Sequence, residues 1–301
     1  MARIESYPSP VFSNTSRQIK SILFPTDFSE TARQAFTYTL RLAEDLGASI
    51  VLLHVYQETP VDIAYMPMEF MDALKAEKME KAHEAFQAYL KDFRSRTVEE
   101  GRINTLLQSG RPANEILRYS EELQVDLIAM GTQGAASPSE KILGSVTAEV
   151  IERAHCPVLA IPRETNYQPV KQILYGLGGE EAEIAVVDKL MALAEGFQAK
   201  LICTHIQAQD EEVDQVQQHP AWEALKSIEE GGNLELVMME NEDEIFRGLQ
   251  KFITRHRVDL LAMMTHQPGK TESYKKRQSL TRKMMLYTDI PLLAFHAPST
   301  R

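Results

Sequence analysis

Residues 20–55 read KSILFPTDFSETARQAFTYTLRLAEDLGASIVLLHV. Two apolar runs, Ile22–Phe24 and Ile50–Val55, flank a segment whose apolar side chains recur with the period of an amphipathic helix. Ser29 is a residue type that favours the start of a helix, and Gly47 is one that favours its end. The stretch therefore predicts a strand, a helix and a second strand, which is the unit of a parallel sheet.

This alternation of strand and helix patterns continues to residue 161. Apolar runs recur at Leu127–Met130 and Val158–Ile161, which suits strands that are buried on both faces. With a third strand ending before Gly110, we expect five strands with helices between them. The order predicts an α/β fold of the Rossmann-like, doubly wound kind, with a mainly parallel sheet. The segments with helical character are 31–46, 72–96, 116–123 and 146–154.

The second part of the chain repeats the first and has lost residues in its middle. The total of 301 residues suits two domains of about 150 residues each. We therefore expect tandem domains at 18–163 and 169–298, each with a five-stranded sheet, joined by a short polar linker that contains Pro169. The aligned segments are 20–24 with 171–175, 49–55 with 200–206, 125–130 with 258–263, and 156–160 with 290–294.

The composition excludes several classes of protein. Hydrophobic residues make up 44% of the chain, which excludes disorder throughout, and the net charge of -11 disfavours nucleic acid as a partner. The two cysteines, Cys156 and Cys203, exclude a disulfide framework and indicate a reducing, cytoplasmic location. Residues 1–17 lack the apolar run of a signal peptide, and no run is long enough to predict a membrane span.

Glycines follow the fourth strand of the first repeat. Gly131 and Gly134 come directly after it, and Gly144 and Ser145 then open a helix. Glycine lets the backbone approach oxygen atoms closely, and the free N–H groups of a helix N-terminus attract anions. The pattern predicts a phosphate site, with a simple glycine turn and an N-cap serine as the alternative.

Other polar residues follow the neighbouring strands. Asp27, after the first strand, is expected to contact ribose or base, or to cap the following helix. Val55 offers backbone groups after the second strand. Arg111 follows the third strand and faces phosphate or solvent, while Pro112 suits the first turn of a helix. Because ligands of such sheets bind at the carboxyl ends of the strands, function is expected in these loops.

Residues 18–162 resemble the universal stress protein family, in particular its ATP-binding branch. The resemblance lies in Pro-Thr-Asp-Phe-Ser at 25–29, in Leu-Leu-His-Val at 52–55, and in the spacing Gly-x2-Gly-x9-Gly-Ser at 131–145. It implies that ATP binds in the first domain with a magnesium or manganese ion held through phosphate oxygens and without a protein metal cage. The implied site residues are Pro25, Thr26, Asp27 and Val55 at adenine and ribose, and Met130, Gly131, Gly134, Gly144, Ser145, Val146 and Thr147 at ribose and phosphates.

The second repeat departs from this pattern. Gly178, Met264, Gln267 and Gln278 stand where the first repeat has Asp27, Gly131, Gly134 and Gly144, and only Ser279 matches Ser145. Side chains thus stand where backbone would approach phosphate. We expect one nucleotide site per chain, with the second domain structural or regulatory. Its basic segment at 270–282 is either a solvated loop or a contact for an anion or partner.

Three functions remain open. The first is a nucleotide sensor in a stress response, the second a slow ATP hydrolase, and the third an interaction scaffold with a small apolar ligand in the second domain. The chain has no Walker-type lysine after the glycines, which favours binding over turnover. Members of the family commonly dimerise through the last strand. We therefore expect residues 158–161 to pair with 292–295 within the chain, and a homodimer of whole chains stays open.

Several conspicuous residues have simpler explanations. His54 and His205 occupy the same repeat position and are expected as strand histidines with one hydrogen bond each. The pair His155-Cys156 is expected to pack rather than to react. The helical segment 72–96 is expected to cover the sheet or to clasp another subunit. Met66, Met68, Phe70 and Met71 precede this segment as an apolar group that suits a lid, a hydrophobic contact or neither.

Overall fold

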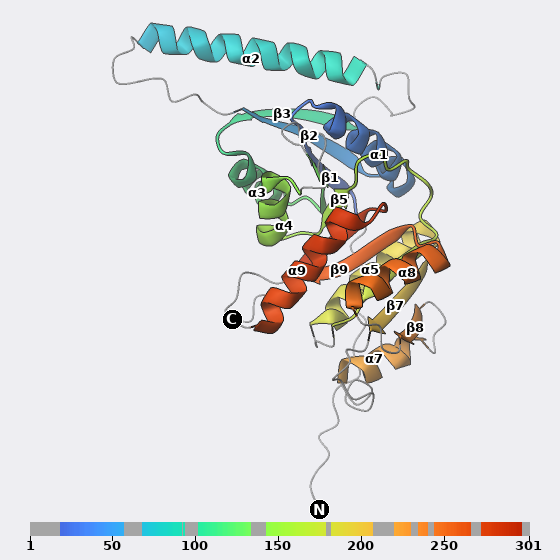
Figure 1. Cartoon of the computed structure of the whole chain (residues 1–301). Coiled ribbons are helices and arrows are strands. Elements are labelled where there is room, and N and C mark those ends of the chain that lie inside the picture. Colours follow the sequence, from blue (N-terminus) through green and yellow to red (C-terminus); the bar gives the residue numbers. More distant parts are fainter. Residues whose placement is uncertain are drawn as a thin grey trace, which may run out of the picture.

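The computed structural model (Figure 1) describes most of the chain. The described residues are 19–56, 68–91, 93, 102–133, 143–178, 182–206, 220–229, 234–239, 244–265 and 272–296.

Strands and helices alternate along both parts of the chain, as the sequence predicts. The first half consists of β1 (Ser21–Pro25), α1 (Glu30–Leu46), β2 (Ser49–Tyr56), α2 (Met68–Lys91), β3 (Ile103–Ser109), α3 (Pro112–Glu122), β4 (Leu127–Gly131), α4 (Ser145–Arg153) and β5 (Val158–Ile161). The second half consists of β6 (Gln172–Gly176), α5 (Glu183–Phe197), β7 (Lys200–Ile206), α7 (Pro220–Glu229), β8 (Leu234–Met239), α8 (Ile245–His256), β9 (Leu260–Thr265), α9 (Glu272–Tyr287) and β10 (Leu292–His296).

All these strands form one sheet rather than two separate five-stranded sheets. Their order is β3-β2-β1-β4-β5-β10-β9-β6-β7-β8, and each half therefore has the same order counted from its outer strand. Among the described strands every neighbouring pair is parallel except β5 with β10. The predicted α/β fold with a mainly parallel sheet is confirmed. The strands of the two halves belong to one continuous sheet.

The antiparallel pair of β5 and β10 joins the halves. Leu292 lies opposite Ala160, Leu293 opposite Leu159, and Ala294 opposite Val158. The predicted pairing of residues 158–161 with 292–295 is therefore confirmed. Each strand would otherwise expose a row of unpaired backbone groups, and the pairing removes both edges at once. It leaves β3 and β8 as the outer strands.

Helix α1 shows how local sequence sets the ends of an element. The Ser29 hydroxyl accepts a hydrogen bond from Ala32 N at 3.2 Å, which satisfies one of the N–H groups that a helix start leaves free. At the other end, Gly47 adopts a left-handed conformation with φ of 66°. Such a conformation costs glycine little, because it has no Cβ to clash. The expected helix signals at Ser29 and Gly47 are both confirmed.

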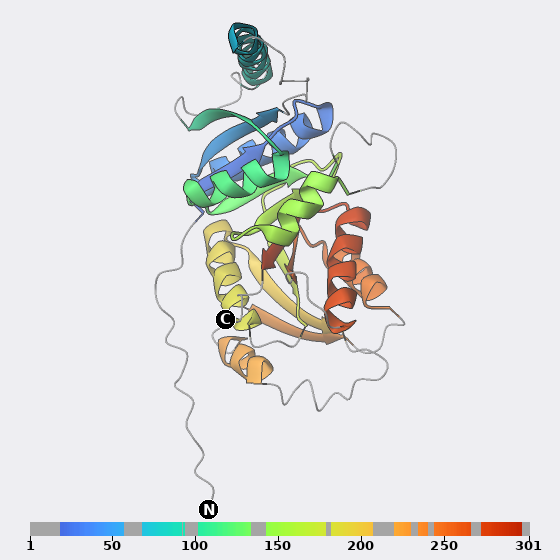
Figure 2. The same ribbon diagram turned by 90° about the vertical axis from the view of Figure 1, so that its left-hand side faces the viewer.

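Helices cover both faces of the sheet. One apolar cluster joins α1, α2, α5 and α7 to one face, and a second cluster joins α3, α4, α8 and α9 to the other. In Figure 2, α5 (yellow) and α9 (red) lie on opposite sides of the sheet in the second half. The fold is therefore doubly wound, as expected from the alternation of elements.

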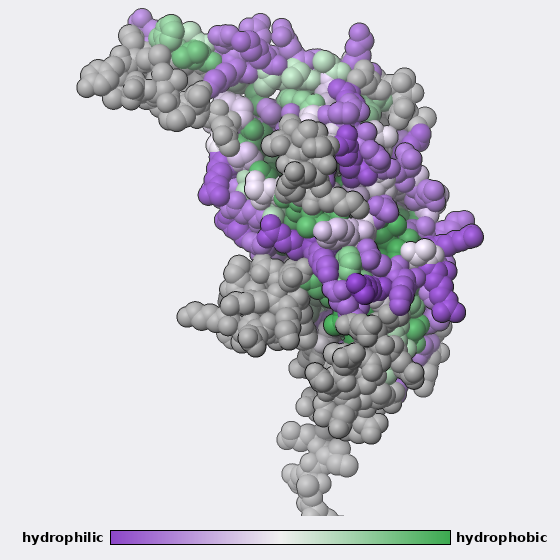
Figure 3. Space-filling model, in the orientation of Figure 1, coloured by the Kyte–Doolittle hydropathy of each residue, from purple (hydrophilic) through white to green (hydrophobic). Residues whose placement is uncertain are grey.

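Helix α2 covers the sheet only with its second part. Ala82, Phe86 and Tyr89 are buried, whereas Phe70 and Met79 remain 54% and 55% exposed. Figure 3 shows hydrophobic surface over the beginning of this helix, away from the sheet. The predicted role as core cover thus holds for the C-terminal part of α2. Among the described helices, none combines the length and the hydrophobicity needed to cross a bilayer.

Candidate functional site

The candidate site lies where the strand order of the first half reverses. The chain runs outward from β1 through β2 to β3 and then returns to place β4 on the opposite side of β1. Ile22 lies beside Leu127, and Leu23 beside Ile128, in a parallel ladder. The loops that follow β1 and β4 therefore leave the sheet at neighbouring positions of one edge. This is the place where doubly wound sheets bind their ligands.

The turn after β1 is held by short-range hydrogen bonds. Thr26 is buried, its backbone N–H donates to Leu53 O at 2.8 Å, and its hydroxyl accepts from Phe28 N at 3.0 Å. Asp27 is exposed, and its Oδ1 accepts from Ser29 N at 3.0 Å. The N-cap of α1 is Ser29 rather than Asp27. Of the two predicted roles of Asp27, helix capping is therefore wrong.

Phe28 is a structural residue of this turn that the sequence did not reveal. Its φ is 60°, a left-handed conformation that is costly for a bulky side chain. The ring lies 4.4 Å from the His54 ring and 5.1 Å from the Phe86 ring, measured between centroids. These contacts hold Phe28 against β2 and α2, while the preceding Asp27 faces solvent. Local sequence carries no signal for a left-handed phenylalanine.

A second set of hydrogen bonds ties β4 to α4. The Thr147 hydroxyl donates to Gly131 O at 3.0 Å, and Gly144 N donates to Thr132 O at 2.9 Å. Thr132 itself donates from its N–H to Ile161 O at 3.0 Å. A Cβ added to Gly131 would lie 3.3 Å from the carbonyl oxygen of Gln133, so the backbone there has little room for a side chain. Thr132 is a further residue of this loop that sequence reasoning missed.

Within the part of the chain that the structure describes, no N-cap side chain bonds the first-turn amides of α4. The N-cap residue is Gly144, and the first turn contains no acidic residue. Ser145 is the first residue of the helix and is exposed, so it is not the helix cap that the sequence also allowed. A helix start with free N–H groups and a partial positive charge favours an anion.

Most of the predicted site residues come from this edge of the sheet. Met130 is buried in β4, and Val55 lies at the end of β2, on the other side of β1. Gly134 lies outside the described residues. The predicted residues at the ends of β1 and β4 and at the start of α4 are Pro25, Thr26, Asp27, Met130, Gly131, Gly144, Ser145, Val146 and Thr147.

The corresponding edge of the second half contains a buried carboxylate. Strands β6 and β9 are neighbours there, as β1 and β4 are in the first half. Glu183, in the first turn of α5, is 1% exposed, and its Oε1 accepts from Gly178 N at 2.6 Å. The Tyr175 hydroxyl donates to the same oxygen at 3.4 Å. A buried, hydrogen-bonded carboxyl group thus lies beside the end of β6.

The histidines and cysteines that stand out in the sequence are mostly buried or held by hydrogen bonds within the fold. The His54 ring Nδ1 lies 2.8 Å from Thr26 O, and His205 is buried. Burial raises the pKa of the Cys156 thiol to about 12 and also raises the pKa of Cys203. His155 lies 3.4 Å from the buried Ser120 hydroxyl. The expectation that His155 and Cys156 pack rather than react agrees with these surroundings, since a nucleophilic thiol needs a lowered pKa.

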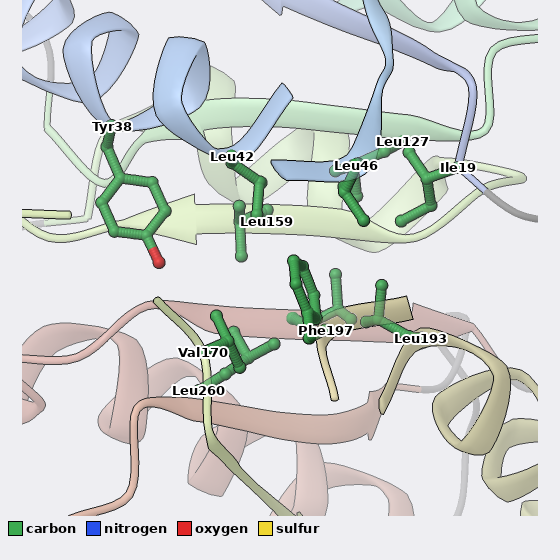
Figure 4. A pocket seen from close by; sticks show the side chains of 11 residues that line it. Ile19, Tyr38, Leu42, Leu46, Leu127, Leu159, Val170, Leu193, Phe197 and Leu260 are labelled. Atoms are coloured by element: carbon green, nitrogen blue, oxygen red, sulfur yellow. The ribbon is translucent and has the colours of Figure 1, made fainter. Parts of the chain in front are cut away.

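Two further features concern ligands. Among the described residues, no three His, Cys, Asp or Glu side chains gather in a group that would hold a metal ion. A cavity of about 10 Å³ lies between α1 and α5, at the junction of the halves (Figure 4). Its walls are apolar and include Leu42, Phe197 and Leu293. This is about the smallest space that holds one water molecule, so an apolar ligand of ordinary size does not fit there.

Comparisons with known proteins agree with these features. The sequence profile described as "Universal stress protein family" matches residues 18–162. A universal stress protein of Methanocaldococcus jannaschii is 32% identical over 154 residues, which cover 51% of this chain and 88% of that protein. Another from the same organism is 31% identical over 160 residues, which cover 49% of this chain and 97% of that protein.

A solved structure extends the likeness to both halves. The crystal structure of a universal stress protein from Archaeoglobus fulgidus has a TM-score of 0.66 and 16% identity, and the match covers 94% of this chain and 98% of that one. At this identity the likeness concerns the fold. The alignments with the two sequence relatives cover most of the length of those proteins. This chain belongs to the universal stress protein family.

Proposed function

We propose that the protein binds ATP at the edge formed by β1 and β4 and acts as a nucleotide sensor or regulator in a stress response. The main support for this proposal is that β1 and β4 are adjacent, parallel strands of the sheet. This arrangement brings the turn at 25–29 and the start of α4 to the same edge of the sheet, where ligands of doubly wound folds bind. Adenine and ribose would lie at the β1 side and the phosphates at the α4 side.

The residues at this edge fit the chemistry of a nucleoside triphosphate. Glycine at the N-cap of α4 leaves the first-turn N–H groups open to phosphate oxygens, and the exposed Ser145 hydroxyl adds a donor beside them. The exposed carboxylate of Asp27 can accept hydrogen bonds from ribose hydroxyls. Gly131 keeps the loop after β4 close to the backbone of its neighbours. The hydrogen-bond donors at the start of α4 suit the phosphates of ATP, and the acceptor at Asp27 suits its ribose.

A magnesium or manganese ion belongs to this proposal. Bound with ATP, it would neutralise part of the charge of the phosphates. Hard divalent ions in nucleotide sites commonly take most of their ligands from phosphates and water. We therefore propose no dedicated set of protein ligands for the ion.

The proposal assigns one nucleotide to each chain. We propose that the chain is a tandem of two family domains, 18–163 and 169–298, of which the first binds ATP. The surroundings of Gly178 support this asymmetry. Gly178 stands where the first repeat has the exposed Asp27, and its N–H donates to the buried carboxyl group of Glu183. The second domain would then serve a structural or regulatory role.

Two further properties follow the family resemblance. We propose that the protein acts in the cytoplasm, in line with its two buried free cysteines. If whole chains also dimerise, they would use a surface other than β5 and β10, because these strands already pair with each other. The outer strands β3 and β8 offer such edges.

Equilibrium titration of the full chain with ATP and magnesium tests the proposal. We expect a stoichiometry near one nucleotide per chain. Ser145→Ala should weaken the affinity about three- to tenfold, because one hydroxyl donor to a charged group is lost. Ser279→Ala, the matched change in the second repeat, should leave the affinity unchanged. No binding by the unaltered chain, or a stoichiometry near two, would contradict the proposal.

Release of ADP under the same conditions separates a sensor from a slow hydrolase. We expect tight binding without turnover above the background of the Ser145→Ala variant. Turnover that is lost in this variant would instead favour the hydrolase, since a site that orients phosphates and a metal ion already lowers the barrier to attack by water.

A further inference from the structure

We propose that Arg111 binds the polyphosphate of the nucleotide and thereby sets the preference of the site for ATP over nucleosides. The inference rests on the proposed ATP site and adds a residue from a third loop, the one between β3 and α3. Arg111 is not part of the glycine pattern, and from the sequence it could face either phosphate or solvent.

The local backbone sends Arg111 toward α4. Gly110 has a φ of 146°, which side chains rarely allow, and a Cβ on it would come within 2.9 Å of the Glu115 side chain. Arg111 is then the N-cap of α3, and Pro112 begins the helix. Helices α3 and α4 lie side by side on one face of the sheet (Figure 1). The turn therefore fixes where the arginine leaves the backbone.

The present partner of Arg111 lies one helical turn from the proposed phosphate position. The Arg111 guanidinium lies 3.1 Å from the Glu149 carboxylate, which belongs to α4. Glu149 follows Ser145 by four residues, and residues at this spacing lie on the same face of a helix, about 5–6 Å apart at their Cβ atoms. A change of rotamer is therefore enough to carry the long arginine side chain from Glu149 to an anion at the start of α4.

When Arg111 leaves Glu149, the Glu149 carboxylate keeps Arg153 as its partner. Glu149 also binds Arg153 at 2.5 Å, and Arg153 in turn donates to Asn114 at 3.1 Å. The Arg111 side chain is 68% exposed, so its ion pair with Glu149 is a weak surface interaction. Arg153 holds the carboxylate whether Arg111 is present or not. In this cluster Arg153 stays bound to Glu149 and Asn114, whereas Arg111 can leave Glu149 to bind an anion.

The chemistry of the guanidinium points to phosphate as the new partner. Its planar fork matches the spacing of phosphate oxygens and can donate two parallel hydrogen bonds. In a chain with net charge of -11, a cation near the start of α4, where the N-cap residue is Gly144, also offsets an unfavourable overall field. Adenosine, which has no phosphate, gains nothing from this contact.

Binding of ATP, ADP, AMP and adenosine to the full chain and to variants tests the inference. Arg111→Ala should weaken ATP binding about tenfold and leave adenosine binding unchanged, because only the phosphates contact the arginine. Arg118→Ala is the matched control. It removes the same charge from the helix that Arg111 precedes and breaks comparable surface ion pairs with Glu115 and Glu122, and it should leave ATP binding unchanged.

Glu149→Gln provides a second, independent variant. It releases Arg111 and removes a negative charge near the phosphates, so ATP affinity should rise about two- to fivefold, and this gain should shrink when Arg111→Ala is added. Equal ATP affinity of Arg111→Ala and the unaltered chain would overturn the inference, as would equal losses in Arg111→Ala and Arg118→Ala. If the unaltered chain binds no ATP, the proposed function fails as well, which distinguishes the two outcomes.

Discussion

The Thr147 hydroxyl donates a hydrogen bond to the carbonyl oxygen of Gly131 at 3.0 Å and so fixes the start of α4 to the end of β4. The two partners are sixteen positions apart in the sequence, and the segment between them contains most of the predicted phosphate pattern. The bond therefore determines where the free amides of α4 lie relative to the sheet. Stability and ligand affinity should depend on it together.

Thr147→Val keeps the shape of this buried side chain and removes its hydroxyl. We expect a loss of about 1 kcal/mol in the free energy of unfolding, because the Gly131 carbonyl loses a partner, together with weaker ATP binding. Urea denaturation and ATP titration measure the two effects. Thr147→Ser retains the hydroxyl and should restore ATP affinity. Unchanged stability in Thr147→Val would show that water replaces the lost donor.

Phe28 should give an unusual order of stability among its variants. Both Phe28→Ala and Phe28→Gly lose the ring contacts with His54 and Phe86 and should cost about 2–4 kcal/mol. Because φ is 60° here, glycine should be more stable than alanine by about 1 kcal/mol, the reverse of the usual order. Urea midpoints of the two variants test this. An alanine variant as stable as the glycine variant would mean that the turn relaxes when the ring is removed.

Glu183 should be important for the stability of the second half. Glu183→Ala removes the acceptor of Gly178 N, and we expect a cost of about 1–3 kcal/mol. Glu183→Gln keeps an acceptor oxygen and should cost less. Glu195→Ala, an exposed position on the same helix, is the control and should change the free energy of unfolding by less than about 0.5 kcal/mol. Equal effects at the two positions would contradict a structural role of the buried carboxylate.

Both cysteines should be unreactive in the folded chain. Burial raises the pKa of the Cys156 thiol to about 12, so at pH 8 almost all of it is protonated, and the pKa of Cys203 is raised in the same direction. Because the thiolate is the reactive form, labelling by a thiol reagent at pH 8 should be slow in the native protein. After unfolding in guanidinium, two thiols per chain should react. Rapid labelling of native Cys156 would show that its pocket opens readily.

The sequence predicted where the residues of the candidate site lie in the fold, as far as residue type and local order determine it. The glycine at 144, the serine at 145 and the aspartate at 27 occupy the ends of the elements expected for them. The bounds of β3 could not be predicted from an apolar run. This strand lies at the edge of the sheet, and it contains the exposed polar residues Asn104 and Thr105. The left-handed Phe28 and the ion pair of Arg111 with Glu149 were also missed, since both depend on residues distant in the chain.

By itself the sequence determined the alternation of elements and the class of fold, because periodic apolar patterns report which side chains each element buries. Only the tertiary structure decided that β4 lies beside β1, that β5 and β10 join the halves into one sheet, and that the buried Glu183 accepts a hydrogen bond from Gly178 in the second half. The first two relationships are contacts between segments far apart in the chain. Local patterns do not encode them, because they arise from the order in which strands add to the sheet.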